Sequence, residues 1–129
     1  MIAVDTNIVV RFLTRDDESQ FQKTLALFKT DDLFIPDTVV LESEWVLRYA
    51  YDFEPTAIAD AFTKLFGLSN VYLTNPEIIA QAIQWALAGL DFSDAFHLAQ
   101  SAQCDRLYSF DKKFITKAKG LCPCRVVEP

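Results

Sequence analysis

The sequence is poor in the residues that mark non-globular proteins. Its 129 residues include only three Gly and five Pro, which excludes collagenous and low-complexity chains. It also lacks a long hydrophobic run, since the longest apolar-rich segment, 78–90, is interrupted by Gln81 and Gln84 and is too short to span a bilayer. We therefore expect a soluble protein with no membrane partner.

Cysteine and histidine are scarce as well. The three cysteines are Cys104, Cys122 and Cys124, and an odd number without a recognisable secretory signal predicts a reducing, cytoplasmic location. A zinc site is disfavoured because Cys122 and Cys124 have no second cysteine pair and His97 is the only histidine.

What the chain does have is apolar bulk and acidic charge. Half of it (51%) is apolar and 13% is aromatic, as expected for one compact domain over residues 1–129. The net charge of the whole chain, −6, disfavours a nucleic-acid partner. The charge is unevenly distributed, however: a cluster of lysines follows Asp111, namely Lys112, Lys113, Lys117 and Lys119.

Short apolar runs alternate with longer segments of helical spacing. Strands are predicted at 2–4, 33–35, 71–73, 106–110 and 125–127. Helices are predicted at 8–13, from 16 or 17, at 37–51, 55–66 and 76–88, from 91 or 93 to 104, and after 111. Apolar strands separated by helices indicate an α/β fold with a buried parallel sheet.

Two acids directly follow predicted strands. Asp5 comes after the first strand and Asp111 after the fourth. Because right-handed crossovers bring the carboxyl ends of parallel strands to one edge, we expect both side chains at that edge. Each alone is equally consistent with a helix N-cap.

Glu42 stands out on the predicted helix 37–51. With Val39 at zero, Glu42 falls at about 300°, on the apolar arc between Tyr49 at about 280° and Val46 at about 340°, with Trp45 at about 240°. Glu44 and Arg48 fall at about 140° and 180°. This wheel predicts that Glu42 points to the core or to a cleft, and that Glu44 and Arg48 form a surface pair.

Asp91 and Asp94 flank the start of another predicted helix. Capping and the helix dipole explain Asp91 well and Asp94 less well. Several carboxylates that converge without matching cations repel one another, so they favour a hard divalent metal. Oxygen-only ligands suit Mg²⁺ or Mn²⁺, and such an ion can activate water for attack on a phosphodiester.

Two polar residues lie close to these acids in the sequence. Asn7 follows Asp5 by two residues, and its amide could orient Asp5 or bind a phosphate. Ser109 precedes Asp111 by two residues, and its hydroxyl could hydrogen-bond an acidic side chain or a metal-bound water. Both are also ordinary turn or strand-end residues.

Four segments in order resemble the PIN-domain ribonucleases, and VapC-type toxins in particular. They are Val4-Asp5-Thr6-Asn7-Ile8, Val39 to Arg48 around Glu42, Asp91-Phe92-Ser93-Asp94-Ala95, and Ser109-Phe110-Asp111-Lys112-Lys113-Phe114. Glu44 departs from this pattern, because the family usually has an apolar residue there. Ser109 stands where Thr is commoner.

The resemblance implies a three-layer α/β/α sandwich with a parallel five-stranded sheet ordered 3-2-1-4-5. It implies a Mg²⁺- or Mn²⁺-dependent endoribonuclease toxin whose catalytic and metal-binding acids are Asp5, Glu42, Asp94 and Asp111, with Asp91 as a further candidate ligand. The expected partners are structured RNA such as tRNA or rRNA, a cognate antitoxin, and a second copy of the chain in a homodimer.

Arg11, Arg15, Lys112 and Lys113 are the candidate contacts to RNA phosphates. Two other functions fit the same acids. One is another Mg²⁺-dependent phosphoryl-transfer enzyme. The other is a non-catalytic PIN-like binding module, in which the acids are caps and ion pairs.

Overall fold

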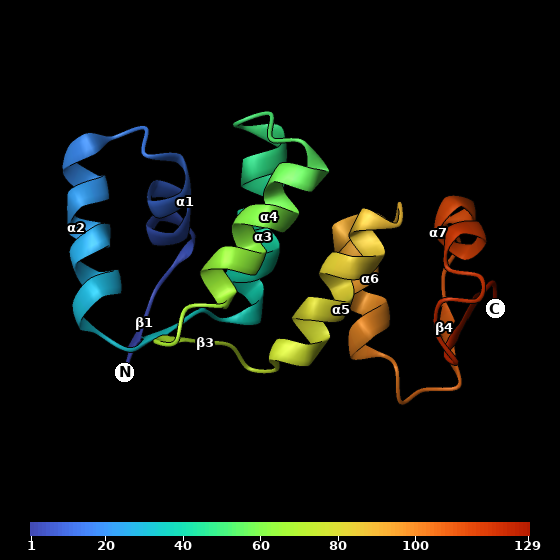
Figure 1. Ribbon diagram of the computed structural model, residues 1–129. Coiled ribbons are helices and arrows are strands. Elements are labelled where there is room, and N and C mark those ends of the chain that lie inside the picture. The colour runs from blue at the N-terminus through green and yellow to red at the C-terminus, as the bar shows by residue number, and fades with distance from the viewer. The chain divides into compact units, whose positions relative to one another are not determined.

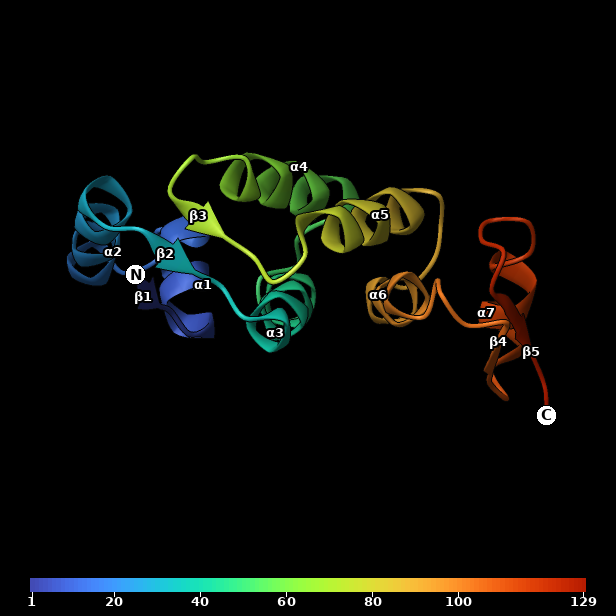
Figure 2. The same cartoon turned by 90° about the horizontal axis from the view of Figure 1, so that it is seen from below.

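The computed structural model describes all 129 residues as five strands and seven helices. The chain divides into two compact units, residues 1–76 and residues 77–129. Figures 1 and 2 show the elements of each unit in two perpendicular views. No helix combines the length and the apolar character needed to cross a membrane.

The first unit contains a three-stranded parallel sheet in the order β1-β2-β3. The strands pair in register, with Ile2 beside Leu33 and Leu33 beside Val71. Figure 2 shows the three strands side by side among the helices of this unit. Its elements are β1 (Ile2–Ala3), α1 (Thr6–Thr14), α2 (Glu18–Thr30), β2 (Leu33–Phe34), α3 (Asp37–Tyr49), α4 (Pro55–Phe66) and β3 (Val71–Tyr72).

Local signals set the ends of these helices. The Asp17 carboxylate accepts a hydrogen bond from the backbone N–H of Gln20 and begins α2. Pro55 occupies the first turn of α4, where its missing N–H costs nothing, and Gly67 caps the other end. Apolar side chains from the strands and helices then fill the core, among them Leu33, Ile35, Leu47, Phe62 and Leu65.

The second unit contains a two-stranded parallel sheet, β4 beside β5. Arg106 pairs with Arg125, Leu107 with Val126 and Tyr108 with Val127. Its core includes Ile79, Ala82, Ala95 and Leu98. Its elements are α5 (Pro76–Leu87), α6 (Phe92–Gln100), β4 (Arg106–Tyr108), α7 (Lys112–Lys117) and β5 (Arg125–Val127).

These sheets confirm an α/β fold with parallel strands. All five predicted strands are present, and the neighbours 3-2-1 and 4-5 pair as expected. The sheet is divided into three and two strands. A continuous five-stranded sheet with β1 beside β4, its three layers and a single domain over 1–129 stay predictions.

The faces of α3 differ from the sequence-based prediction. The buried side of this helix carries Val40, Ser43, Glu44 and Leu47, and α3 packs against α1 and α4. Glu42 is exposed, and Trp45 and Tyr49 are more than half exposed. The assignment of Glu44 and Arg48 to a surface pair is therefore wrong. The wheel misled because it placed the aromatic residues on the buried side.

Candidate active site

Asp5 lies at the carboxyl end of β1, as the sequence predicts. Its backbone is extended, and its Oδ1 accepts a hydrogen bond from the backbone N–H of Ile8 at 3.3 Å. Asp5 is therefore the N-cap of α1, which fixes its carboxylate at the start of that helix. Its other oxygen, Oδ2, is not used by this cap.

Glu42 reaches the same place from α3. The hydroxyl of Thr6, the residue after Asp5, donates a hydrogen bond to Glu42 Oε1. Thr6 itself is buried, whereas Glu42 is exposed. A buried hydroxyl needs a hydrogen-bond partner, and the Glu42 carboxylate provides one. Asp5 and Glu42 are therefore both held beside the N-terminus of α1.

Thr6 is a site residue that the sequence reasoning missed. The sequence signal for Thr6 is a hydroxyl side chain at the first position of α1, directly after Asp5 and shortly before the apolar residues Val9 and Val10, which the structure buries. A hydroxyl at that position is expected to find an acceptor close to the preceding acid.

The remaining acids come together in the second unit. Asp91 caps α6, where its Oδ2 accepts hydrogen bonds from the backbone N–H and the hydroxyl of Ser93. Asp111 caps α7, where its Oδ1 accepts from the backbone N–H of Phe114 at 3.1 Å. Asp94 lies in the first turn of α6.

The charge of Asp94 is destabilised by its surroundings. Partial burial raises the pKa of this carboxyl, and the negative charges of Asp91 and Asp111 raise it further. His97 acts weakly in the opposite direction. Mutual repulsion among carboxylates is the electrostatic condition that a bound cation relieves.

The two auxiliary residues differ in how well they are placed. Ser109 Oγ accepts a hydrogen bond from the backbone N–H of Asp111 at 3.0 Å, so it supports the backbone of the fourth acid. This contact differs from the expected bond to an acidic side chain or a metal-bound water. Asn7 is exposed in the first turn of α1.

The donor set fits a hard divalent cation. All the candidate ligands are carboxylates, and the caps at Asp5 and Asp111 each occupy only Oδ1. Oxygen atoms of this kind are the ligands that Mg²⁺ and Mn²⁺ prefer. Two of the four principal acids belong to each unit, and the structure arranges no three His, Cys, Asp or Glu side chains to hold one ion.

The candidate RNA-binding residues fall into two groups. Arg11 donates to Gln20 and Tyr51 and lies 3.3 Å from Asp16, and Arg15 pairs with Glu18 at 2.8 Å. These two guanidinium groups are thus engaged inside the first unit. Lys112 and Lys113 are exposed at the start of α7.

Comparisons with known proteins identify the family to which the chain belongs. A crystal structure of VapC20 from Mycobacterium tuberculosis, described as a toxin that cleaves the sarcin-ricin loop, is similar at 21% identity. The similarity covers 97% of this chain and 99% of that one with a TM-score of 0.44. No curated protein matches. The family model of the PIN domain matches residues 2–120, so the chain belongs to the PIN-domain family.

Proposed function

We propose that the protein is a metal-dependent endoribonuclease. The observation that carries this proposal is the contact between Thr6 and Glu42, which holds a second carboxylate beside Asp5 at the end of β1. Membership of the PIN-domain family supports it. Asp5, Glu42, Asp94 and Asp111 are the proposed metal ligands, with Asp91 beside them.

Each residue has a defined task in this proposal. Asp5 and Asp111 are held by the helices that they cap, so their free oxygens are oriented before a ligand arrives. Thr6 orients Glu42, and Ser109 supports the backbone at Asp111. A divalent cation bound by these acids would activate water and neutralise charge on the phosphate during phosphodiester cleavage.

The VapC-like segments around these acids support a toxin function. We propose that the substrate is a structured RNA such as tRNA or rRNA, that a cognate antitoxin inhibits the protein, and that two copies form a homodimer in the cytoplasm. A small reading frame directly upstream, encoding a DNA-binding segment and a tail, is the expected genetic context.

Cleavage of defined RNA tests the catalytic proposal. Purified protein with Mn²⁺ is expected to cut RNA internally, and EDTA is expected to stop it. Asp5→Asn and Asp94→Asn should each lower the rate by at least about 100-fold, because an amide is a neutral and poor metal ligand. Circular dichroism should show that both variants fold.

The matched control is Asp60→Asn, because Asp60 is an exposed acid of α4 paired with Lys64. This variant should cleave like the wild type. Cleavage that persists in EDTA, or that survives in Asp5→Asn, would contradict the proposal. Cutting of DNA but not of RNA of the same sequence would contradict the choice of substrate.

A further inference from the structure

Two arginines of the second unit lie side by side without acidic partners. The chain has five arginines, and Arg11, Arg15 and Arg48 each form an ion pair. Arg106 and Arg125 form none. They are register partners on β4 and β5, so their charges repel each other and favour a shared anion.

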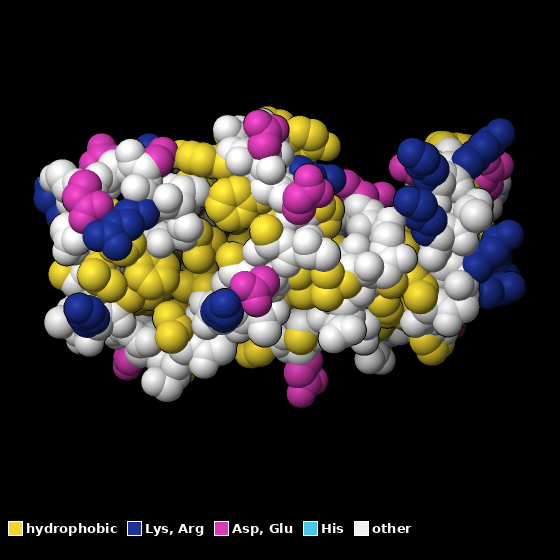
Figure 3. All heavy atoms as spheres, turned by 45° about the horizontal axis from the view of Figure 1, so that its top comes forward, with side chains coloured by type: hydrophobic (Ala, Val, Ile, Leu, Met, Phe, Trp, Pro, Cys, Tyr) yellow, Lys and Arg dark blue, Asp and Glu magenta, His cyan; other side chains and the backbone are white.

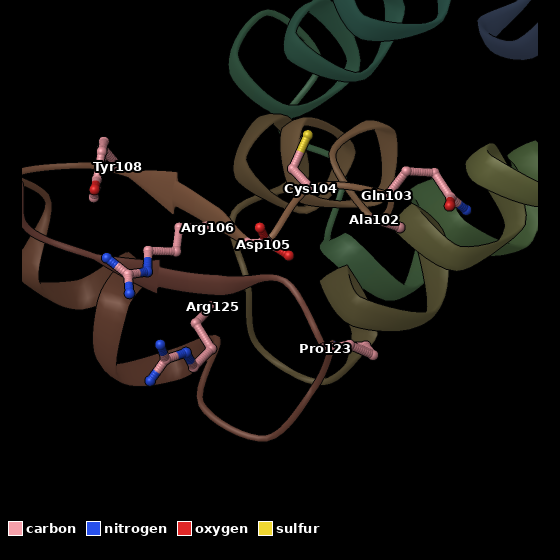
Figure 4. Close-up of a pocket in the computed structure, with 8 residues that line it drawn as sticks. All are labelled: Ala102, Gln103, Cys104, Asp105, Arg106, Tyr108, Pro123 and Arg125. Atoms are coloured by element: carbon pink, nitrogen blue, oxygen red, sulfur yellow. The ribbon is translucent and has the colours of Figure 1, made fainter.

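The two arginines line an open groove. It has a volume of about 860 Å³, and its other lining residues include Asp105, Tyr108 and Pro123. Figure 4 shows both guanidinium groups extending in the same direction from the two strands. Asp105 is the only acid that lines the groove, so the arginines outnumber it.

The surrounding segment is basic in an acidic protein. Residues 106–125 contain six Lys and Arg and a single acid, Asp111, for a formal charge of +5, so the remaining residues carry −11. Figure 3 shows Lys and Arg side chains gathered over these C-terminal elements. Such a local concentration of positive charge is the electrostatic signature of a polyanion site.

An exposed aromatic ring, Tyr108, lines the same groove as the two arginines. Tyr108 is two residues after Arg106, so both project from the same side of β4, and Tyr108 is 58% exposed. Leu107 and Val126, on the alternate positions, are the more buried residues of the two strands. Phe110, between Tyr108 and the acid Asp111, is 78% exposed.

We propose that Arg106, Arg125 and Tyr108 bind a single-stranded stretch of RNA, such as a loop of a structured RNA. The arginines contact successive phosphates, and Tyr108 stacks on an unpaired base, the combination by which proteins hold single strands. The inference rests on the proposed function for its choice of RNA, and it adds a binding track that leads along β4 towards Asp111.

Binding in EDTA tests the track separately from cleavage. The probe is a fluorescein-labelled 12-nucleotide oligouridine, and the readout is anisotropy at several salt concentrations. Arg106→Ala with Arg125→Ala should weaken binding about tenfold and reduce the magnitude of the negative slope of log K against log salt by about 1.4, because two phosphate contacts are lost. Lys23→Ala with Lys29→Ala, which removes two exposed lysines of α2, is the charge-matched control.

Tyr108→Ala should weaken binding at every salt concentration without changing the slope, whereas Tyr108→Phe should bind like the wild type. Unchanged affinity and slope in the double arginine variant would overturn the proposal, as would a wild type that does not bind the oligonucleotide. A loss of thermal stability in Tyr108→Ala as large as that of a core truncation would also overturn it, since the ring would then be packed inside the protein.

The two proposals fail in different ways. Binding that depends on Arg106 and Arg125 without any Mn²⁺-dependent cleavage would reject the nuclease and retain the RNA track. Cleavage with Mn²⁺ that is indifferent to both arginines would do the reverse.

Discussion

Two glutamates of α3 show how strongly position decides the role of a residue. Glu42 is exposed and accepts the hydroxyl of Thr6. Glu44 is buried and pairs with Arg48 at 2.9 Å. A buried ion pair is weak evidence for stability, because desolvation offsets its attraction. An apolar residue, as the VapC-like pattern usually has, would serve the packing role of Glu44, but it could not serve the ligand role that we propose for Glu42.

Asp94 gives a prediction at the residue scale about pH. Its pKa is raised in the folded protein, so its stabilising contribution is fully present below about pH 4 and is lost as the pH rises through the folded-state pKa. In EDTA at pH 7, Asp94→Asn should therefore be more stable than the wild type, because the amide carries no charge to be buried or repelled. Thermal unfolding between pH 3 and pH 7 measures this.

At pH 3 the stability difference between Asp94→Asn and the wild type should vanish, since the protonated acid resembles the amide. Asp60→Asn should show no such gain at pH 7, because Asp60 pairs with Lys64. A wild type that becomes more stable relative to Asp94→Asn between pH 3 and pH 7 would contradict the prediction.

At the scale of elements, three of the candidate metal ligands are also the N-caps of helices. Asp5, Asp91 and Asp111 are N-caps of α1, α6 and α7, and ordinary capping rules predict all three from the sequence. A cap uses one carboxylate oxygen and fixes the other. The same position can therefore begin a helix and bind a cation.

Substitutions at Asp5 separate these two roles. Asp5→Asn keeps a capping oxygen and should retain the stability of the wild type, whereas Asp5→Ala should lose about 1 kcal/mol. Both should lose RNA cleavage. The control is Asp17→Ala, which removes the cap of α2, should cost a similar amount and should leave cleavage intact. Urea unfolding and the cleavage assay measure the two effects.

Equal cleavage by Asp5→Asn and the wild type would show that Asp5 is only a cap. Equal stability of Asp5→Ala and Asp5→Asn would show that its cap contributes nothing.

At the scale of the whole molecule, charge is unevenly divided along the chain. Residues 1–76 contain six basic and twelve acidic residues, and residues 77–129 contain six of each. The whole net charge of −6 thus lies in the first unit. The net charge disfavoured a nucleic-acid partner because it is a sum over both units, and the second unit by itself is neutral.

A metal titration tests whether the four acids act together. Mn²⁺ at about 100 times its dissociation constant should stabilise the wild type by about 2.7 kcal/mol. If one site uses ligands from both units, Glu42→Gln and Asp94→Asn should each remove this thermal shift. Asp105→Asn, an acid outside the proposed ligand set, should keep it.

Retention of the whole thermal shift in Asp94→Asn would confine the cation to residues 1–76. Its retention in Glu42→Gln would confine the cation to residues 77–129. Either result would contradict a shared centre.

Much of this protein follows from local rules that the sequence obeys. The strands, the cap at Asp17, the proline that begins α4 and the acids that follow β1 and β4 depend on neighbouring residues, so spacing and side-chain chemistry predict them. The parallel direction of the strands follows from the alternation of strands and helices, whereas the neighbours 3-2-1 and 4-5 were implied by the resemblance to PIN domains.

The tertiary structure decided which side of a helix is covered and which charge finds a partner. Hydrophobicity alone put Trp45 and Tyr49 inside, yet α1 and α4 cover the face with Ser43 and Glu44. The contact of Thr6 with Glu42 and the pairing of Arg106 with Arg125 join residues far apart in the chain. Such contacts depend on how whole elements pack, which no local pattern encodes.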